Sequence, residues 1–194
     1  MHTEILSTRQ QELLPSINQF KRSFYLVEGT AIGLQLGHRR SIDFDLFSHT
    51  KLNKTRIKQW LSEIPYTKST LFEDFDQMHF NINKVKVTFF QYPFPVEHPV
   101  KWENNLTMPD LLTLAAMKAY ALGRKSKWKD YVDLYFLIGH YAITDISRKA
   151  KSIFGELFSE KMFLQQLAFH KDIDYQEAVE YLAPNPPTEQ GCCI

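Results

Sequence analysis

Two aspartates, Asp43 and Asp45, stand two positions apart in a segment, residues 41–47, that alternates polar and apolar side chains. Alternation with a period of two predicts a β-strand with one polar face, so both carboxylates leave that face about 7 Å apart at the backbone. Carboxylates this close repel each other when both are ionised, unless a cation lies between them. Mg²⁺ suits the pair because it accepts one or two protein carboxylates while phosphate oxygens fill its other positions. A solvated polar strand face is the alternative interpretation.

A second feature, Gly29-Thr30, lies between a strand-like run at residues 24–27 and a helix-forming segment. The start of a helix offers free backbone N–H groups and the positive end of its dipole, which together bind phosphate. A plain glycine turn with a threonine cap is the alternative. The cations Arg39 and Arg40 come just before the acidic strand, where they either pair with its aspartates or bind nucleotide phosphates.

A third feature combines Lys118, within an otherwise apolar helix, with a later pair of carboxylates at Asp130 and Asp133. The lysine either extends along the rim of the core or points its ammonium into a cleft, where it suits a triphosphate. The two aspartates share a helix face at a spacing of three, and an acid near a helix start is favoured by the dipole alone. The basic run at residues 124–129 is either a solvated loop or a contact for a polyanion.

The remaining pattern predicts one α+β domain over residues 1–183, followed by a polar tail at 184–194. We expect a sheet-containing core at about 1–105 and a helical half at about 106–183. A tight hairpin turn is expected at Asn83-Lys84, and a helix start capped by Thr107 with Asp110 reaching back. The expected strands cover 24–27, 41–47, 67–72, 77–82 and 85–90, and the expected helices 4–20, 31–37, 53–64, 107–122, 128–141, 143–154, 159–169 and 175–182.

Composition narrows the function classes. A net charge of +1 provides no global basic field for nucleic acid, so any RNA contact must come from a local patch. The start of the chain has no signal-peptide pattern, and no apolar run is long enough to span a bilayer. The two cysteines, Cys192 and Cys193, are neighbours and cannot form a disulfide framework. We therefore expect a cytoplasmic protein without a membrane partner.

The three features together resemble the AbiEii/AbiGii family of nucleotidyltransferase-like toxins, known from abortive-infection and type IV toxin–antitoxin systems. The resemblance lies in residues 28–32, 37–47, 118–124 and 129–135, with order and spacing kept. It implies a polymerase-beta-like fold, an α+β arrangement of a mixed β-sheet, flanking helices and a helical C-terminal half. It also implies transfer of NMP from an NTP to an acceptor hydroxyl, in some members the acceptor end of tRNA, by a toxin that an antitoxin restrains.

Carried over by position, the resemblance implies that Asp43 and Asp45 hold catalytic Mg²⁺. Lys118 would contact the triphosphate, and Asp133, together with Asp130, would complete the catalytic cleft. The nucleotide-binding residues that we expect are Gly29, Thr30, Arg39, Ser41, Lys118, Arg124, Lys129 and Asp130.

Two positions depart from the family pattern. Glu28 stands where the family commonly has glycine, which puts a carboxylate near the expected phosphates. Larger nucleotidyltransferases carry a third carboxylate on a later strand, where this chain has Thr88, so the general base stays unassigned. These departures motivate an alternative, a non-catalytic nucleotide- or RNA-binding relative. A protein-interaction module is a third hypothesis, based on the aromatic-rich residues 89–102.

Overall fold

A five-stranded mixed sheet lies at the centre of the computed structural model, which describes residues 1–122, 127–169 and 173–184. Its strand order is β1-β2-β5-β4-β3, and only β2 and β5 run parallel to each other. The strands are β1 (Tyr25–Val27), β2 (Asp43–Ser48), β3 (Lys68–Glu73), β4 (Gln77–Ile82) and β5 (Val85–Gln91). The expected strands are thereby confirmed to within about two residues at their ends.

The hairpin between β4 and β5 turns at Asn83 and Lys84, as expected. Both residues have left-handed backbones, with φ of 52° and 66°. A two-residue turn of this kind matches the twist of the strands that it joins. The turn sets the register between β4 and β5, in which Thr88 pairs with His79. On its other side β5 pairs with β2, and there Thr88 lies opposite Asp45.

One face of the sheet is apolar and is covered by the helices α1 (Thr8–Ile17) and α3 (Lys54–Glu63). Phe20, which follows α1, and Trp60 of α3 meet Phe89 of β5 with ring centroids 4.9 and 5.6 Å away. Such edge-on aromatic contacts add to the stability gained from burial. The opposite face carries Asp43 and Asp45, so the period-two pattern places both carboxylates away from this core.

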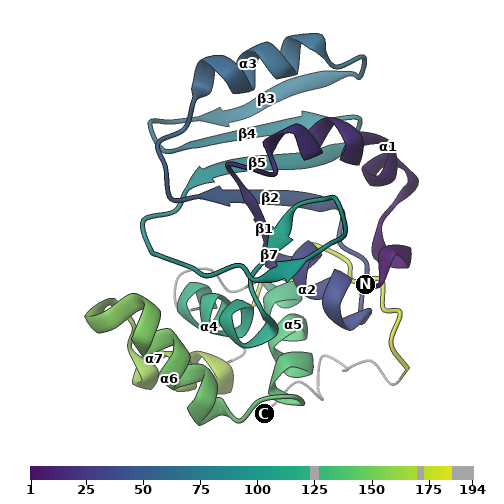
Figure 1. The fold of residues 1–194 in the computed structure, drawn as a ribbon. Coiled ribbons are helices and arrows are strands. Elements are labelled where there is room, and N and C mark those ends of the chain that lie inside the picture. The colour runs from purple at the N-terminus through teal and green to yellow at the C-terminus, as the bar shows by residue number, and fades with distance from the viewer. Residues whose placement is uncertain (123–126, 170–172, 185–194) are drawn as a thin grey trace.

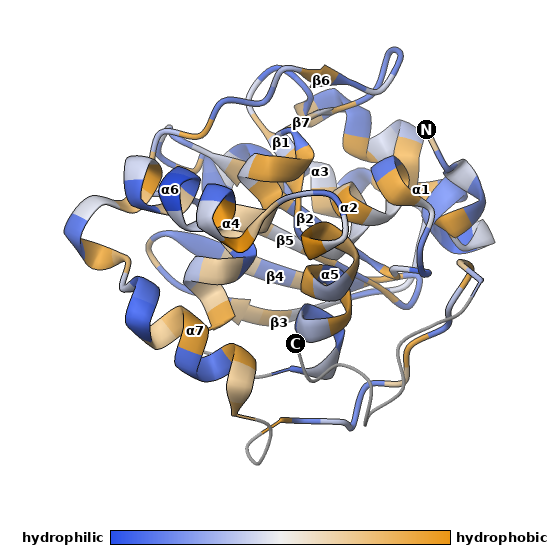
Figure 2. Ribbon diagram, turned by 90° about the horizontal axis from the view of Figure 1, so that it is seen from below, coloured by the Kyte–Doolittle hydropathy of each residue, from blue (hydrophilic) through white to orange (hydrophobic). Residues whose placement is uncertain are grey.

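The C-terminal half is helical and gathers on the side of β1 and β2 (Figure 1). The apolar helix α4 (Leu111–Leu122) packs against α2 (Glu28–Leu36), α5 (Trp128–Ile138), α6 (Ile143–Phe154) and α7 (Glu160–Ala168). Tyr120 of α4 stacks on Phe154 of α6, with ring centroids 4.0 Å apart. Figure 2 shows α6 and α7 with hydrophilic and hydrophobic sides, as expected for helices that lie on a core.

Two predictions about these elements are wrong. Thr107 does not cap α4 but belongs to the short strand β7 (Thr107–Met108), which pairs with β6 (Val100–Lys101). Asp110 is the cap, because its carboxylate accepts a hydrogen bond from the Thr113 N–H at 2.7 Å. Residues 175–182, expected as a helix, run as an extended segment instead.

This extended segment, which we call the C-terminal strap (residues 173–184), is tied down at both ends. Asp174 pairs with Lys127 through the backbone, and Tyr181 pairs with Arg39. The Leu182 N–H also donates to the carbonyl of His38 at 2.9 Å. Within the described parts of the chain, no helix is long and apolar enough to cross a lipid bilayer.

Candidate active site

A cavity of about 360 Å³ opens between the polar face of the sheet, the start of α2 and the helices α4 and α5. The sheet contributes Asp43, Asp45 and Thr88, and α4 contributes Lys118. Gly29 stands in the wall where α2 begins. Residues from four distant parts of the sequence therefore share one cavity. The sequence-predicted residues in its lining are Gly29, Arg39, Ser41, Asp43, Asp45, Lys118, Lys129 and Asp130.

The two carboxylates on β2 are half-buried and experience different surroundings. Burial is the main cause that raises the pKa of Asp45 to about 6, and the negative charges of Glu28 and Asp43 add to it. A hydrogen bond from Thr88 and the charge of Lys86 act in the opposite direction. Asp43 has an ammonium partner, with its Oδ2 3.7 Å from Lys129 Nζ. The pair is therefore short of positive charge, mainly at Asp45.

The start of β2 is fixed by the first turn of α2. The Thr30 hydroxyl donates to the carbonyl of Asp43 at 2.5 Å and lies 2.9 Å from the Ser41 hydroxyl. Thr30 is only 1% exposed and does not line the cavity. Its hydroxyl therefore holds the acidic strand, and does not face the cavity where we expected phosphates.

Gly29 is required by a close approach of Arg39. A Cβ atom at this position would collide with the Arg39 guanidinium and would lie 3.2 Å from the Ser41 hydroxyl. Any larger residue would push Arg39 out of place. The glycine thus allows the Arg39 guanidinium to pack against the start of α2.

Behind this wall lies a network that we call the buried anchor, namely Asp133 with His38, Arg39 and Lys118. Asp133 is fully buried and accepts hydrogen bonds from Arg39 Nε at 2.7 Å, Arg39 Nη2 at 2.8 Å and His38 Nε2 at 2.8 Å. Burial would raise the pKa of Asp133, but the charges of Arg39 and Lys118 and these hydrogen bonds hold it well below its usual range. Asp133 does not line the cavity, so it does not complete the cleft as expected.

Lys118 connects the buried anchor to the cavity. Its ammonium contacts Asp130, lies 2.5 Å from Glu28 Oε2 and lies 3.4 Å from Asp133 Oδ2. Burial would lower the pKa of Lys118, but these three carboxylates raise it well above its usual value. The lysine is therefore charged and is already surrounded by acids of its own chain.

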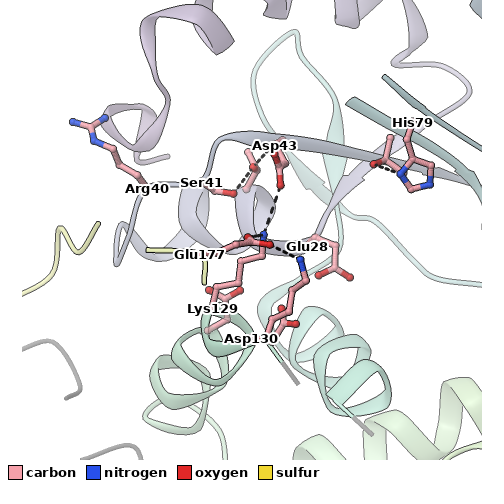
Figure 3. Close-up of polar contacts among 12 residues, drawn as sticks. Glu28, Arg40, Ser41, Asp43, His79, Lys129, Asp130 and Glu177 are labelled. Atoms are coloured by element: carbon pink, nitrogen blue, oxygen red, sulfur yellow. Dashed lines mark hydrogen bonds and ion pairs between the residues drawn. The ribbon is translucent and has the colours of Figure 1, made fainter. Parts of the chain in front are cut away.

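At the mouth of the cavity lies an exposed network of three residues. Glu177 of the C-terminal strap forms one ion pair with Lys127 and another with Lys129, and we call these residues together the rim pair. Glu177 Oε2 is 2.5 Å from Lys129 Nζ, and Lys127 approaches the other oxygen. Figure 3 shows Lys129 pointing from α5 towards Asp43, with Glu177 beside it. Burial opposes the ionisation of Glu177, yet its hydrogen bonds to the two lysines lower its pKa to about 2. Arg124, a predicted nucleotide-binding residue, lies outside the described residues.

Sequence reasoning missed several groups in or beside the cavity. Lys86 pairs in register with Asp43 and lines the cavity, a position that the alternation in residues 85–90 signals once the strand partner is known. His79 and Gln77 line it from β4 and are joined by a hydrogen bond of 2.9 Å. Glu177 carried no local signal, because its segment has helical periodicity but is extended.

The residues present fit a magnesium ion held by two carboxylates. Asp43 and Asp45 share one strand face and line the same cavity. In the described ranges, no group of three or more His, Cys, Asp or Glu side chains converges as a complete protein cage for a metal. Mg²⁺ often takes one or two carboxylates and completes its octahedron with substrate phosphates and water. The donor set therefore suits a cation that is bound together with a phosphate ligand.

A mixed sheet with two acids on its second strand, facing helices that carry cations, defines a nucleotidyltransferase-like protein. Comparison with known proteins gives the family. The chain belongs to the AbiEii family, described as nucleotidyl transferase AbiEii toxin of type IV toxin–antitoxin systems, whose model matches residues 13–188. Membership implies a nucleotide substrate and an antitoxin partner.

One relative and two solved structures are also similar to this chain. An uncharacterized protein of Aquifex aeolicus, aq_aa25, is 30% identical over 141 residues, which cover 69% of this chain and 67% of the relative. A putative nucleotidyltransferase from H. pylori aligns with a TM-score of 0.55 and 19% identity, over 81% of this chain and 90% of that chain. The nucleotidyltransferase toxin MenT4 from Mycobacterium tuberculosis aligns with a TM-score of 0.59 and 14% identity, over 86% of this chain and 72% of that chain. The two structures establish the shared fold.

Proposed function

We propose that this protein transfers an NMP from an NTP to an acceptor hydroxyl on RNA, such as tRNA, and acts as a cytoplasmic toxin that an antitoxin restrains. The observation that carries this proposal is the shared cavity of Asp43 and Asp45 with Lys118 and Lys129. Two carboxylates for a metal and several cations for phosphates are the groups that phosphoryl transfer needs. The family gives the toxin class, and the chain's own geometry supports the chemistry.

In the proposed reaction the acceptor oxygen forms a bond to the α-phosphorus, and the bond from that phosphorus to the bridging oxygen breaks. Pyrophosphate leaves, and the proton of the hydroxyl passes to solvent or to a base that stays unassigned. Asp43 and Asp45 would hold Mg²⁺, which supplies charge that polarises the α-phosphate and lowers the pKa of the acceptor hydroxyl. Lys129 and Lys86 line the same cavity and would compensate the charge of the leaving pyrophosphate.

The test is transfer of labelled nucleotide by the purified protein, with each NTP, Mg²⁺ and total RNA. We expect Asp43→Asn to lower the transfer rate at least about 100-fold, because the metal loses one of two ligands. Asp145→Asn is the matched control, since Asp145 is exposed on α6 and pairs only with Arg148 among the described residues. Transfer at the unaltered rate in Asp43→Asn would show that the carboxylate pair is not the catalytic site.

The alternative is a relative that binds nucleotide or RNA without turnover. It is favoured by Glu28, which adds a carboxylate to the cavity, and by Thr88, which pairs in register with Asp45 where a third acid could stand. In that case NTP binds, and Asp43→Asn weakens its binding, but no labelled RNA forms with any NTP. The same transfer assay therefore decides between the two functions.

A further inference from the structure

Glu28 has a backbone that its side chain disfavours. Its φ is 60°, in the left-handed region that residues other than glycine rarely adopt. Strain of this kind persists where the surrounding structure imposes it, and it occurs often at functional sites. Glu28 also lines the cavity, and its side chain is 29% exposed.

The Glu28 carboxylate is placed against Lys118, yet the charge of Lys118 does not require it. Lys118 and Arg39 carry two positive charges, and Asp130 and Asp133, which surround them, carry two negative charges. Glu28 adds a third negative charge to this balanced group. It is also close enough to Asp45 to raise the pKa of that carboxyl. Glu28 therefore makes the cavity more negative than its metal-binding pair alone would.

The position of Glu28 at the start of α2 has a simpler explanation, because an acid in the first turn interacts favourably with the helix dipole. That interaction explains the residue type. It does not explain a left-handed backbone or a carboxylate 2.5 Å from Lys118 Nζ. The left-handed backbone and this contact therefore motivate a role for Glu28 in the cavity.

We propose that Glu28 is a specificity-determining residue of the nucleotide site, which blocks the cavity-facing side of Lys118 and repels any polyphosphate whose charge is not compensated. A triphosphate would then bind well only together with a divalent cation, which offsets the surplus carboxylate. This inference rests on the proposed function, since it assigns a selective role within the same site. Its ligand class is the metal-complexed triphosphate, as distinct from the free polyphosphate anion.

The test measures binding of inorganic tripolyphosphate by calorimetry, in EDTA and in Mg²⁺. We expect Glu28→Gln to tighten binding in EDTA about tenfold, the effect of removing one partly screened unit charge, and to change binding in Mg²⁺ much less. Glu73→Gln removes the same charge from β3, where Glu73 pairs with Lys54 and Lys58, and it should leave both affinities unchanged. An unchanged or weaker affinity of Glu28→Gln in EDTA overturns the inference, as does an equal gain in both conditions.

A second variant separates charge from backbone strain. Glu28→Gly removes the carboxylate and also suits a φ of 60°, so it should bind tripolyphosphate like Glu28→Gln but melt about 2–4 °C higher. It also serves the binding test if Glu28→Gln does not fold. If the unaltered protein binds neither tripolyphosphate nor NTP, even with Mg²⁺, the proposed function fails and this inference fails with it. If only the charge effect is absent, the proposed function stands and the role of Glu28 falls.

Discussion

The buried anchor and the rim pair are both built from one class of interaction, yet they differ in what surrounds them. In the buried anchor, Asp133 is fully buried between Arg39 and Lys118. In the rim pair, the side chain of Glu177 is 45% exposed and that of Lys127 is 37% exposed. A buried charge that loses its partner is left without compensation, whereas an exposed one regains water.

This difference divides the cations of the cavity into two kinds. The buried anchor cannot release Arg39 or Lys118 without a large cost, so it positions the cavity wall. The rim pair can exchange Glu177 for a phosphate oxygen at little cost, because its lysines are partly solvated. We therefore propose that Lys129, which also lies 3.7 Å from Asp43, is the cation that takes up a substrate phosphate.

The largest effect on the free energy of unfolding is expected when the ion pairs of the buried anchor are broken. Asp133→Ala leaves Arg39 and Lys118 with less compensation inside the protein, and we expect it to lower the free energy of unfolding by about 3–5 kcal/mol. Denaturant unfolding followed by circular dichroism measures this. Asp130→Ala is the matched control, because Asp130 is half-buried and contacts Lys118 alone among the ion pairs of the described residues. If both variants lost the same free energy of unfolding, the deeper burial of Asp133 would not explain its contribution to stability.

An effect of intermediate size and opposite sign on the free energy of unfolding is expected from replacing Asp45. The pKa of about 6 in the folded protein lies above the ordinary value of about 3.9, so the folded state binds more protons between these values. The stability of the metal-free protein should therefore fall as the pH rises from about 4 to 6. We expect Asp45→Asn to remove this decrease of stability with pH. The same variant should raise the free energy of unfolding at pH 7 by about 1–3 kcal/mol in EDTA. If the stability of Asp45→Asn still decreased between about pH 4 and 6, the titrating group would be another residue.

The smallest effect on stability is expected at the rim pair. Glu177→Gln should change the free energy of unfolding by less than about 1 kcal/mol, since exposed ion pairs contribute little. It should nevertheless tighten tripolyphosphate binding about threefold at low salt, because Lys127 and Lys129 become available, and this gain should vanish near 1 M salt. Glu180→Gln removes an exposed acid of the same strap that pairs with Arg40, and it should show no gain. A gain that survives high salt would contradict the exchangeable character of the rim pair.

The local part of this structure could be predicted from the sequence. The alternation around Asp43 and Asp45 gave their strand and shared face, and Asn83-Lys84 gave the hairpin turn, because both depend on neighbouring residues only. The placement of Gly29 after a strand and at a helix start was predicted in the same way. That the acidic pair and this helix start lie at one site was an expectation from the family resemblance, because local patterns do not report which distant elements meet.

The non-local part could not be predicted. Asp133 and Arg39 are 94 residues apart, and no local pattern shows that they meet in the core. The C-terminal strap was expected as a helix because of its periodicity, but helix propensity is a weak preference that tertiary contacts override. Its backbone pairs with Arg39 and Lys127 instead, and this pairing brings Glu177 to the rim.

The central claim is that the carboxylate pair on β2 binds the metal and the nucleotide, whereas the buried anchor stabilises the fold. Thermal melts of Asp43→Asn and Asp133→Asn, each with and without NTP and Mg²⁺, test it in one experiment. We predict that Asp43→Asn melts no lower than the unaltered protein but loses the rise in melting temperature that the ligand produces, whereas Asp133→Asn melts much lower and keeps that rise. A full ligand-induced rise in Asp43→Asn, or its loss in an Asp133→Asn protein of unaltered stability, would contradict the claim.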